Sequence, residues 1–360
     1  MNTEKLKLIG WNKERSAEFH RVLDSMDSRN SEKNDYIPGR VIGMHREIFE
    51  VQTITRRILC TPAGRFRQTA ELWPSVGDWL IIKALDEESG VIVDMLSRSS
   101  VLSRGAAGAQ TAEQVIAANV DFIFIVSGLD NDFNLRRMER YITLAWNSGA
   151  SPVIVLSKSD LVEDPDYYTD QAAESAPGVD IHVTSGLKGV GLDEIRAYLR
   201  DGKTGVLVGS SGSGKSTLIN QLLDREVQKT RDVREGDQRG RHTTTSRTLF
   251  VLPAGGALID TPGLREVGLW GDVSSLDEGF REIAGLAERC RFGDCSHQHE
   301  PGCAVLAAVE AGDITRDRYK AYMKQARELA FLADKQDALK RKKEWHKQIT
   351  REIRKLYKDR

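Results

Sequence analysis

Short apolar runs and amphipathic segments alternate through the middle of the chain. Four runs have the length and composition of buried strands: residues 120–128, 151–157, 180–186 and 204–209. Two segments carry apolar residues three or four positions apart, as helices do: residues 135–146 and 192–200. Strands that alternate with helices build a parallel sheet covered on both faces. The pattern therefore predicts an α/β domain over residues 119–275.

The segments on either side have different patterns. Residues 1–37 are polar and end in a loop signal, so we expect an N-terminal extension there. Residues 38–103 hold short strand-like runs broken by Gly, Pro and Asp, which indicates a small all-β module. A five-stranded nucleic-acid-binding barrel would suit this segment, and so would many other small β folds. Residues 104–118 have the composition of a linker, and residues 276–360 are mainly helical. The predicted class is a multidomain α/β protein.

The composition, with 40% hydrophobic and 29% charged residues, is that of an ordinary globular protein. No apolar run of about 18 residues and no signal-peptide pattern occurs, so we expect a cytoplasmic protein with no membrane partner. Charge is uneven, because residues 335–360 hold eleven Lys or Arg against four Asp or Glu. Such a basic tail fits a polyanionic partner or a solvated helical end. The predicted barrel is also rich in arginine: Arg40, Arg46, Arg56, Arg57, Arg65 and Arg67.

A phosphate-loop motif, Gly-x-x-x-x-Gly-Lys-Ser, follows an apolar strand and opens a helix. Its residues, with the one after it, are Gly209, Ser210, Ser211, Gly212, Ser213, Gly214, Lys215, Ser216 and Thr217. The glycines let backbone N–H groups turn toward phosphate oxygens, and the positive end of the helix adds favourable potential. In this motif the lysine reaches the β and γ phosphates, and the Ser216 hydroxyl binds Mg²⁺. A Gly/Ser-rich turn with an ordinary lysine is the alternative, which the flanking strand and helix disfavour.

Two later segments fit the phosphate side of the same site. Asp260 ends an apolar run, and Gly263 completes an Asp-x-x-Gly arrangement in which the carboxylate orients Mg²⁺ through water and the glycine N–H meets the γ phosphate. Thr243 and Thr244 are candidates for the loop threonine that closes on Mg²⁺. His242 precedes them and is our candidate for a catalytic group that assists hydrolysis; a phosphate or RNA contact, or a solvated loop residue, is the alternative.

A variant of the Asn-Lys-x-Asp element that reads guanine precedes the phosphate loop: Ser157, Lys158, Ser159 and Asp160. Guanine presents two donors to one carboxylate and adenine does not, so a buried Asp160 would select guanine. Lys158 would pack its stem along the base, and Ser157 departs from the usual Asn. A second base-reading loop follows: Thr184, Ser185 and Gly186. Both base loops come before the phosphate loop, whereas an ordinary GTPase has the phosphate loop first. We therefore predict a circular permutation, which the closeness of domain termini permits.

Three cysteines and a histidine cluster late in the chain: Cys290, Cys295, His297 and Cys303. Three thiolates and one imidazole make a closed ligand set of the structural zinc type. The spacing is not that of a standard finger, and buried inert cysteines are the alternative. His299 is a nearby rival for the ligand role.

Together these segments resemble the circularly permuted, ribosome small-subunit-dependent GTPase A family. The resemblance covers nearly the whole chain, and its most specific parts are the permuted order and residues 240–245, 260–270 and 290–305. It implies an N-terminal oligonucleotide-binding barrel, a permuted GTPase domain and a C-terminal helical domain with one structural zinc. It also implies that the protein acts in late maturation of the small (30S) ribosomal subunit.

The resemblance further implies that the protein binds rRNA and hydrolyses GTP to GDP faster when the subunit is present. We expect a monomer that uses Mg²⁺ with GTP. Two other classes stay open at this point. One is a phosphate-loop ATPase or kinase, and the other is a non-catalytic RNA-binding module gated by GTP.

Overall fold

The computed structural model describes residues 4–26, 35–69, 72–105, 113–226, 247–261 and 274–330. Contacts divide the chain into two compact units. The first comprises residues 1–103 and 115–267, and the second comprises residues 104–114 and 268–360. Over the described ranges, no helix combines the length and the apolarity needed to cross a membrane.

The predicted N-terminal barrel is present in the first unit. Its strands are β1 (Tyr36–His45), β2 (Ile48–Thr53), β3 (Arg57–Pro62), β4 (Trp79–Ala84) and β5 (Ser89–Met95). They pair in the order β1-β2-β3-β5-β4, and a further pairing of β1 with β4 closes the barrel. Helix α3 (Gly64–Thr69) connects β3 to the segment before β4. In β2 and β3 buried and exposed positions alternate, so one face of each strand fills the interior.

The α/β sheet of the first unit has the strand order β10-β9-β8-β11-β13-β12. These strands are β8 (Phe122–Gly128), β9 (Ser151–Ser157), β10 (Asp180–Val183), β11 (Thr204–Val208), β12 (Thr248–Val251) and β13 (Ala257–Asp260). The helices are α4 (Leu135–Ser148), α5 (Pro165–Ser175), α6 (Leu192–Tyr198) and α7 (Lys215–Leu222), with the 3₁₀ turns η2 (Ser159–Leu161) and η3 (Arg200–Gly202).

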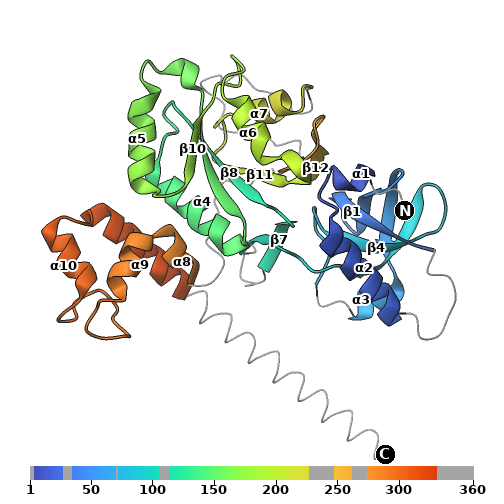
Figure 1. The fold of residues 1–360 in the computed structure, drawn as a ribbon, viewed down its shortest axis with the longest axis horizontal. Coiled ribbons are helices and arrows are strands. Elements are labelled where there is room, and N and C mark those ends of the chain that lie inside the picture. Colours follow the sequence, from blue (N-terminus) through green and yellow to red (C-terminus); the bar gives the residue numbers. More distant parts are fainter. Residues whose placement is uncertain are drawn as a thin grey trace, which may run out of the picture. The chain divides into compact units, whose positions relative to one another are not determined.

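Both faces of this sheet are covered, as the apolar runs predict. Ile123 and Ile154 belong to the buried cluster that contains α4 and α5, whereas Phe124 and Val153 belong to the one that contains α6 and α7. Helices α4 and α5 accordingly lie on one face and α6 and α7 on the other (Figure 1). Successive strand residues thus serve opposite cores.

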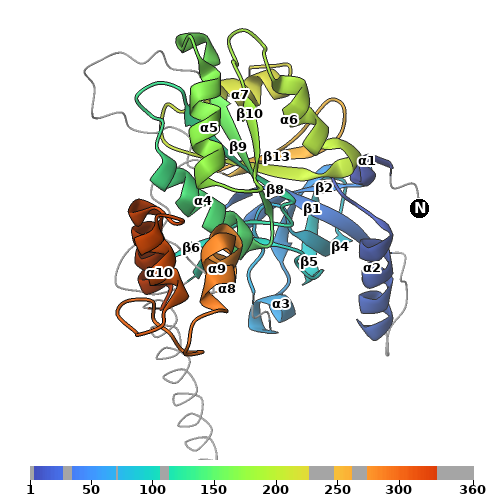
Figure 2. The same ribbon diagram turned by 60° about the vertical axis from the view of Figure 1, so that its left-hand side comes forward.

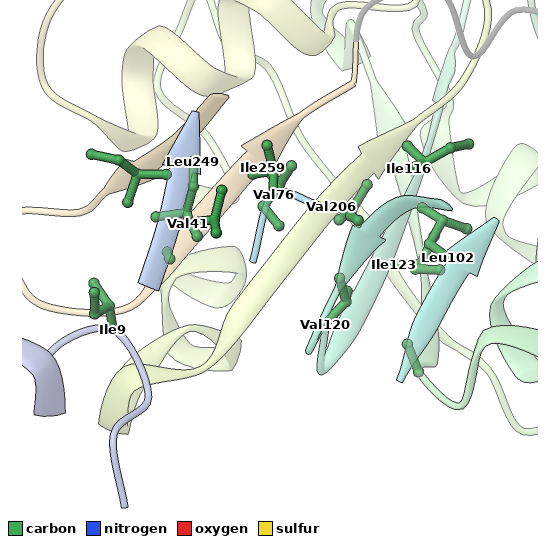
Figure 3. Packing of buried hydrophobic residues seen from close by; sticks show 14 of the residues in the cluster. Ile9, Val41, Val76, Leu102, Ile116, Val120, Ile123, Val206, Leu249 and Ile259 are labelled. Atoms are coloured by element: carbon green, nitrogen blue, oxygen red, sulfur yellow. The ribbon is translucent and has the colours of Figure 1, made fainter. Parts of the chain in front are cut away.

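The barrel and the α/β sheet are continuous within the first unit. Strand β1 pairs antiparallel with β12, with Gly43 opposite Thr248. Val41, Leu249 and Ile259 lie in one buried cluster that spans this junction (Figure 3). The N-terminal extension contributes α1 (Glu4–Lys7) and α2 (Lys13–Met26), and α2 lies against the barrel (Figure 2).

Arg40, one of the six arginines of the predicted barrel, does not contribute to its surface, because the residue is 1% exposed. Its guanidinium donates to the carbonyl oxygens of Gly77 (3.1 Å), Asn119 (3.0 Å) and Ile9, and to the hydroxyl of Thr204 (2.8 Å). These acceptors satisfy a buried cation, which would otherwise be very costly. Arg40 therefore links the barrel strand β1 to the start of β11 through hydrogen bonds.

From residue 274 onward, the described part of the second unit is helical apart from its loops. Its elements are α8 (Ser274–Gly279), α9 (Arg281–Ala287), α10 (Ala304–Ala311) and the helical residues 316–330. Their apolar side chains form a small core that includes Phe280, Ile283, Val305 and Leu329. Strands β6 (Val101–Gly105) and β7 (Glu113–Ala118) pair as a separate two-stranded sheet. The predicted basic helix at 335–360 lies outside the described residues.

Candidate functional site

The phosphate loop joins β11 to α7. Gly209, Gly212 and Gly214 have φ angles of 148°, 83° and 95°, which L side chains rarely adopt. A side chain at Gly209 would also lie 2.2 Å from the carbonyl oxygen of Val126. The backbone path of the turn therefore requires glycine at the first position of the motif.

Lys215 is the first residue of α7 and folds back over the loop. Its Nζ donates to the carbonyl oxygens of Gly209 (2.9 Å) and Ser210, and it lies 3.2 Å from the hydroxyl oxygen of Ser213. The ammonium group is thus held against the loop itself. Its charge and the N-terminal end of α7 favour an anion such as a phosphate there.

The two base-reading segments meet beyond the ends of β9 and β10. The N–H of Ser159 donates to the carbonyl oxygen of Thr184 (3.1 Å). The hydroxyl of Ser185 donates to Oδ1 of Asp160, which orients the carboxylate. Asp160 is half-buried rather than fully buried. A carboxylate in that position is fixed by a neighbour and still accessible to a base.

Two contacts join the base-reading segments to the phosphate loop. The hydroxyl of Ser157 lies 2.5 Å from the carbonyl oxygen of Ser213 and donates to it. Gly186 packs against Thr217 of α7, since a Cβ added at Gly186 would lie 2.8 Å from Cγ2 of Thr217. Three segments that are distant in the sequence therefore form one continuous site.

Asp260 ends β13, the parallel neighbour of β11. Because the carboxyl ends of parallel strands meet at one edge of a sheet, Asp260 lies at the same edge as the phosphate loop. Thr261 continues along this edge and donates its hydroxyl to the carbonyl oxygen of Leu207 (3.4 Å). The other predicted residues of the phosphate side lie outside the described residues: His242, Thr243, Thr244 and Gly263.

The second unit brings Cys290, Cys295, His297 and Cys303 together, with all four ligand atoms within 4.8 Å of one another. Nδ1 of His297 lies 3.6 Å from Sγ of Cys290 and 3.5 Å from Sγ of Cys303, and these two sulfurs are 3.9 Å apart. A tetrahedral zinc ion with ordinary bond lengths would place sulfurs about 3.8 Å apart and sulfur and nitrogen about 3.6 Å apart. The distances among Cys290, His297 and Cys303 fit such an ion, and Cys295 lies close enough to complete the set.

The loop that carries two of these ligands is organised by Glu300. Its carboxylate accepts the backbone N–H groups of Ser296 (3.0 Å), Gln298 (3.1 Å) and His299 (3.2 Å). The side chain of His299 is exposed and does not belong to the cluster. The backbone of His297 is held from the other side, because its carbonyl oxygen accepts the hydroxyl of Tyr319 (2.6 Å).

Comparison with known proteins agrees with this arrangement. A family model described as RsgA GTPase matches residues 95–270, and one described as 50S ribosome-binding GTPase matches residues 204–358. A small ribosomal subunit biogenesis GTPase RsgA 2 from Lactiplantibacillus plantarum is 44% identical over 304 residues, which are 84% of this chain and 86% of the relative. The chain belongs to the RsgA GTPase family. An RsgA protein from Methanosarcina acetivorans is 42% identical and aligns over 97% of this chain and 92% of its own length.

Solved structures of similar proteins extend the family likeness to the fold. YjeQ from Thermotoga maritima is 30% identical, has a TM-score of 0.63, and aligns over 82% of this chain and 99% of its own. YloQ, described as a circularly permuted GTPase, is 26% identical with a TM-score of 0.61, and aligns over 86% of this chain and 99% of its own. The predicted permuted fold is thereby confirmed. As an RsgA GTPase, the protein hydrolyses GTP to GDP and phosphate.

Ser157 stands where the guanine-reading element usually has Asn, and its contact with Ser213 leads to a first prediction. Replacing Ser157 with alanine removes the donor to the carbonyl oxygen of Ser213, and an unpaired buried polar group costs about 1–3 kcal/mol. We expect a loss of that size in the free energy of unfolding of the first unit. Denaturant titration without nucleotide measures it.

Ser157→Asn is the matched control, because it keeps a donor. The pairing of β9 with β10 ends with Leu156 opposite Val183, so position 157 and Thr184 come next along the two strands, and the buried hydroxyl of Thr184 has no hydrogen-bond partner among the described residues. An amide at position 157 can donate to the carbonyl oxygen of Ser213 or to that hydroxyl, so we expect this variant to be more stable than Ser157→Ala. An alanine variant as stable as the parent would contradict the bridging role.

Sequence reasoning missed two groups of residues near these sites. Glu300 was overlooked because a carboxylate beside cysteines carries no motif, although Glu-Pro-Gly is a recognisable turn signal. Asp130 and Asp132 were overlooked because the segment after β8 looked like an ordinary loop. Both carboxylates contact the nucleotide loops, at Lys158 and Ser210.

Proposed function

We propose that this GTPase acts in late maturation of the small (30S) ribosomal subunit, and that the subunit stimulates its GTP hydrolysis. The observation that carries the proposal is the agreement with proteins named small ribosomal subunit biogenesis GTPases, at 42–44% identity over 84–97% of the chain. The nucleotide site supports it, since the base-reading and phosphate-binding segments lie together.

The surfaces proposed to contact rRNA are the barrel and the basic tail. Five arginines of the barrel are exposed: Arg46, Arg56, Arg57, Arg65 and Arg67. Arg57 and Arg67 form exposed ion pairs with Glu50 and Glu47. Exposed arginines and the lysines and arginines of residues 335–360 would bind phosphate groups and release counterions. We therefore expect the association to weaken as salt rises.

At the nucleotide, Lys215 is proposed to pair with the β and γ phosphates, and the Ser216 hydroxyl to hold Mg²⁺ with Asp260 behind it. Bound Mg²⁺ would offset phosphate charge during hydrolysis. Leu264 stands where many GTPases place the glutamine that orients water. A leucine cannot do this, so unaided turnover should be slow, and we propose that His242 supplies the missing group once the subunit is bound.

In the second unit, the Cys290, Cys295, His297 and Cys303 cluster is proposed to hold one structural zinc ion. All four positions of a tetrahedral ion would be filled by protein, which leaves none for catalysis. We also propose that the protein is a cytoplasmic monomer. The domain limits that we propose are those of the sequence pattern, with the GTPase domain at 119–275.

The test is GTP turnover with and without purified small ribosomal subunits. Unaided turnover is expected at about 10⁻⁴ to 10⁻² s⁻¹, with a rise of at least about tenfold when the small subunit is added. Large subunits serve as the control particle, and Lys215→Ala controls for contaminating GTPases. The same rate with small subunits, large subunits and no particle would contradict the proposal.

A further inference from the structure

The loop between β8 and α4 contacts both parts of the nucleotide site. Oδ2 of Asp130 lies 2.5 Å from Nζ of Lys158 in the base-reading element. Oδ1 of Asp132 accepts the hydroxyl of Ser210 in the phosphate loop. Two carboxylates from one short loop therefore reach two separate nucleotide loops.

Both carboxylates are fixed by their own loop. Asp130 accepts the backbone N–H of Asp132 through Oδ1 (3.0 Å), and Asp132 accepts the N–H of Gly128 through Oδ2 (3.3 Å). Arg137 of α4 donates to Oδ1 of Asp132 (2.6 Å). A Cβ at Gly128, the last residue of β8, would lie 2.8 Å from Oδ1 of Asp130, so a side chain there would force this carboxylate to move. Hydrogen bonds within the protein therefore hold both carboxylates in place, without any contribution from a nucleotide.

The negative charges of Asp130 and Asp132 are paired with cations of the same region. Carboxylates beside a polyphosphate site repel the ligand unless cations offset them, and here Lys158 and Arg137 do so. Burial alone would raise the pKa of Asp130, but the ammonium of Lys158 and the N–H of Asp132 outweigh it and lower that pKa. The pair with Lys158 is only 23–32% exposed, so it is less screened than a surface ion pair.

We propose that Asp130 and Asp132 are positioning residues of the nucleotide site, acting through Lys158 and Ser210 respectively. Lys158 has a left-handed backbone, with a φ angle of 61°, which fixes one end of its side chain. Asp130 fixes the other end, so the methylene stem between them is set in place for the base. The hydroxyl of Ser210 donates to Asp132, and the backbone N–H of Ser210 takes no part in that bond. The inference rests on the base-reading role proposed for Lys158.

Double-mutant cycles on nucleotide affinity test this. We expect Asp130→Ala and Asp132→Ala each to weaken GDP and GTP binding by about tenfold, the scale of one charge-assisted hydrogen bond. Each substitution should be coupled to its own partner. Asp130→Ala should cause no further loss of affinity when Lys158 is already alanine, and Asp132→Ala should cause none when Ser210 is already alanine. Asp130→Ala and Ser210→Ala belong to different pairs, so the fold-losses in affinity of the two single variants should multiply in the double variant. Titration of a fluorescent GDP analogue measures all of these.

Asp132→Asn is the conservative control: with its amide oxygen at the Oδ1 position it still accepts the Ser210 hydroxyl and Arg137, while its NH2 group loses the bond from the N–H of Gly128, so it should recover part of the lost affinity. Unfolding without nucleotide is measured in parallel, because a residue that only supports the fold would change stability and leave affinity intact. Parent-like affinity of both alanine variants, or full additivity with the partners, would overturn the inference. If Lys158→Ala weakens binding while Asp130→Ala does not, the base-reading role survives and the Asp130 part of this inference fails.

Discussion

Replacing Cys295 with serine is expected to abolish zinc binding and to unfold the second unit. Structural zinc contributes about 10 kcal/mol or more of folding free energy in small domains. The second unit has only a small apolar core to offset such a loss. Elemental analysis of the purified protein measures the metal, expected at one zinc per chain in the parent. Limited proteolysis reports the unfolding, with cleavage confined to residues beyond about 274.

His299→Ala is the matched control, because it removes an exposed histidine next to the cluster and should keep the metal. GTP binding should survive Cys295→Ser, since the phosphate loop belongs to the first unit. A parent protein without zinc would refute the proposed metal. Loss of zinc in the His299 variant would instead show that the wrong imidazole was assigned.

The phosphate loop and the Cys/His cluster were predictable because their requirements are local. Positive φ angles at Gly209 and Gly214 follow from the turn itself, and the glycine spacing records them in the sequence. The cluster is likewise brought together by a short segment between α9 and α10. The strands of the barrel were predictable as strands for the same reason, from their apolar runs.

Pairings between distant segments could not be predicted in this way. Nothing in residues 36–45 indicates that β1 pairs with β4 and also with β12. Counting arginines likewise failed at Arg40, because a count gives charge and not burial. Burial, followed by the charge of Arg15, lowers the pKa of Arg40 to about 9, so the side chain stays a cation at neutral pH.

The hydrogen bonds of Arg40 and the pairing of β1 with β12 connect the barrel to two strands of the α/β sheet. Arg40 binds Thr204 at the start of β11, the strand that leads into the phosphate loop. Strand β12, which pairs with β1, comes directly after the segment that holds Thr243 and Thr244. The barrel is therefore attached to two strands, one that leads into the phosphate loop and one that follows the segment predicted to close on Mg²⁺. A barrel bound to RNA would influence those strands through the sheet rather than through a flexible linker.

Replacing Asp160 with asparagine is expected to remove the preference for guanine. The parent should bind GTP at least about 10³-fold more tightly than ATP, because sites built for a hydrogen-bonding pattern reject ligands that lack it. A carboxylate at this position can accept both donors of guanine, whereas an amide offers one acceptor and presents a donor to a donor. Competition of GTP and ATP against a fluorescent GDP analogue measures the ratio. We expect it to fall to within about tenfold of unity.

Xanthosine triphosphate makes the same variant a gain-of-binding test. Xanthine carries a carbonyl oxygen where guanine has its exocyclic amine, so the amide of Asp160→Asn can donate to that oxygen. The affinity of this variant for xanthosine triphosphate should therefore rise as its affinity for GTP falls. Ser185→Ala is the control, because it removes the bond that orients Asp160 but keeps the carboxylate. It should weaken GTP binding by no more than about tenfold and keep the base preference. Equal binding of GTP and ATP by the parent would show that Asp160 does not read the base.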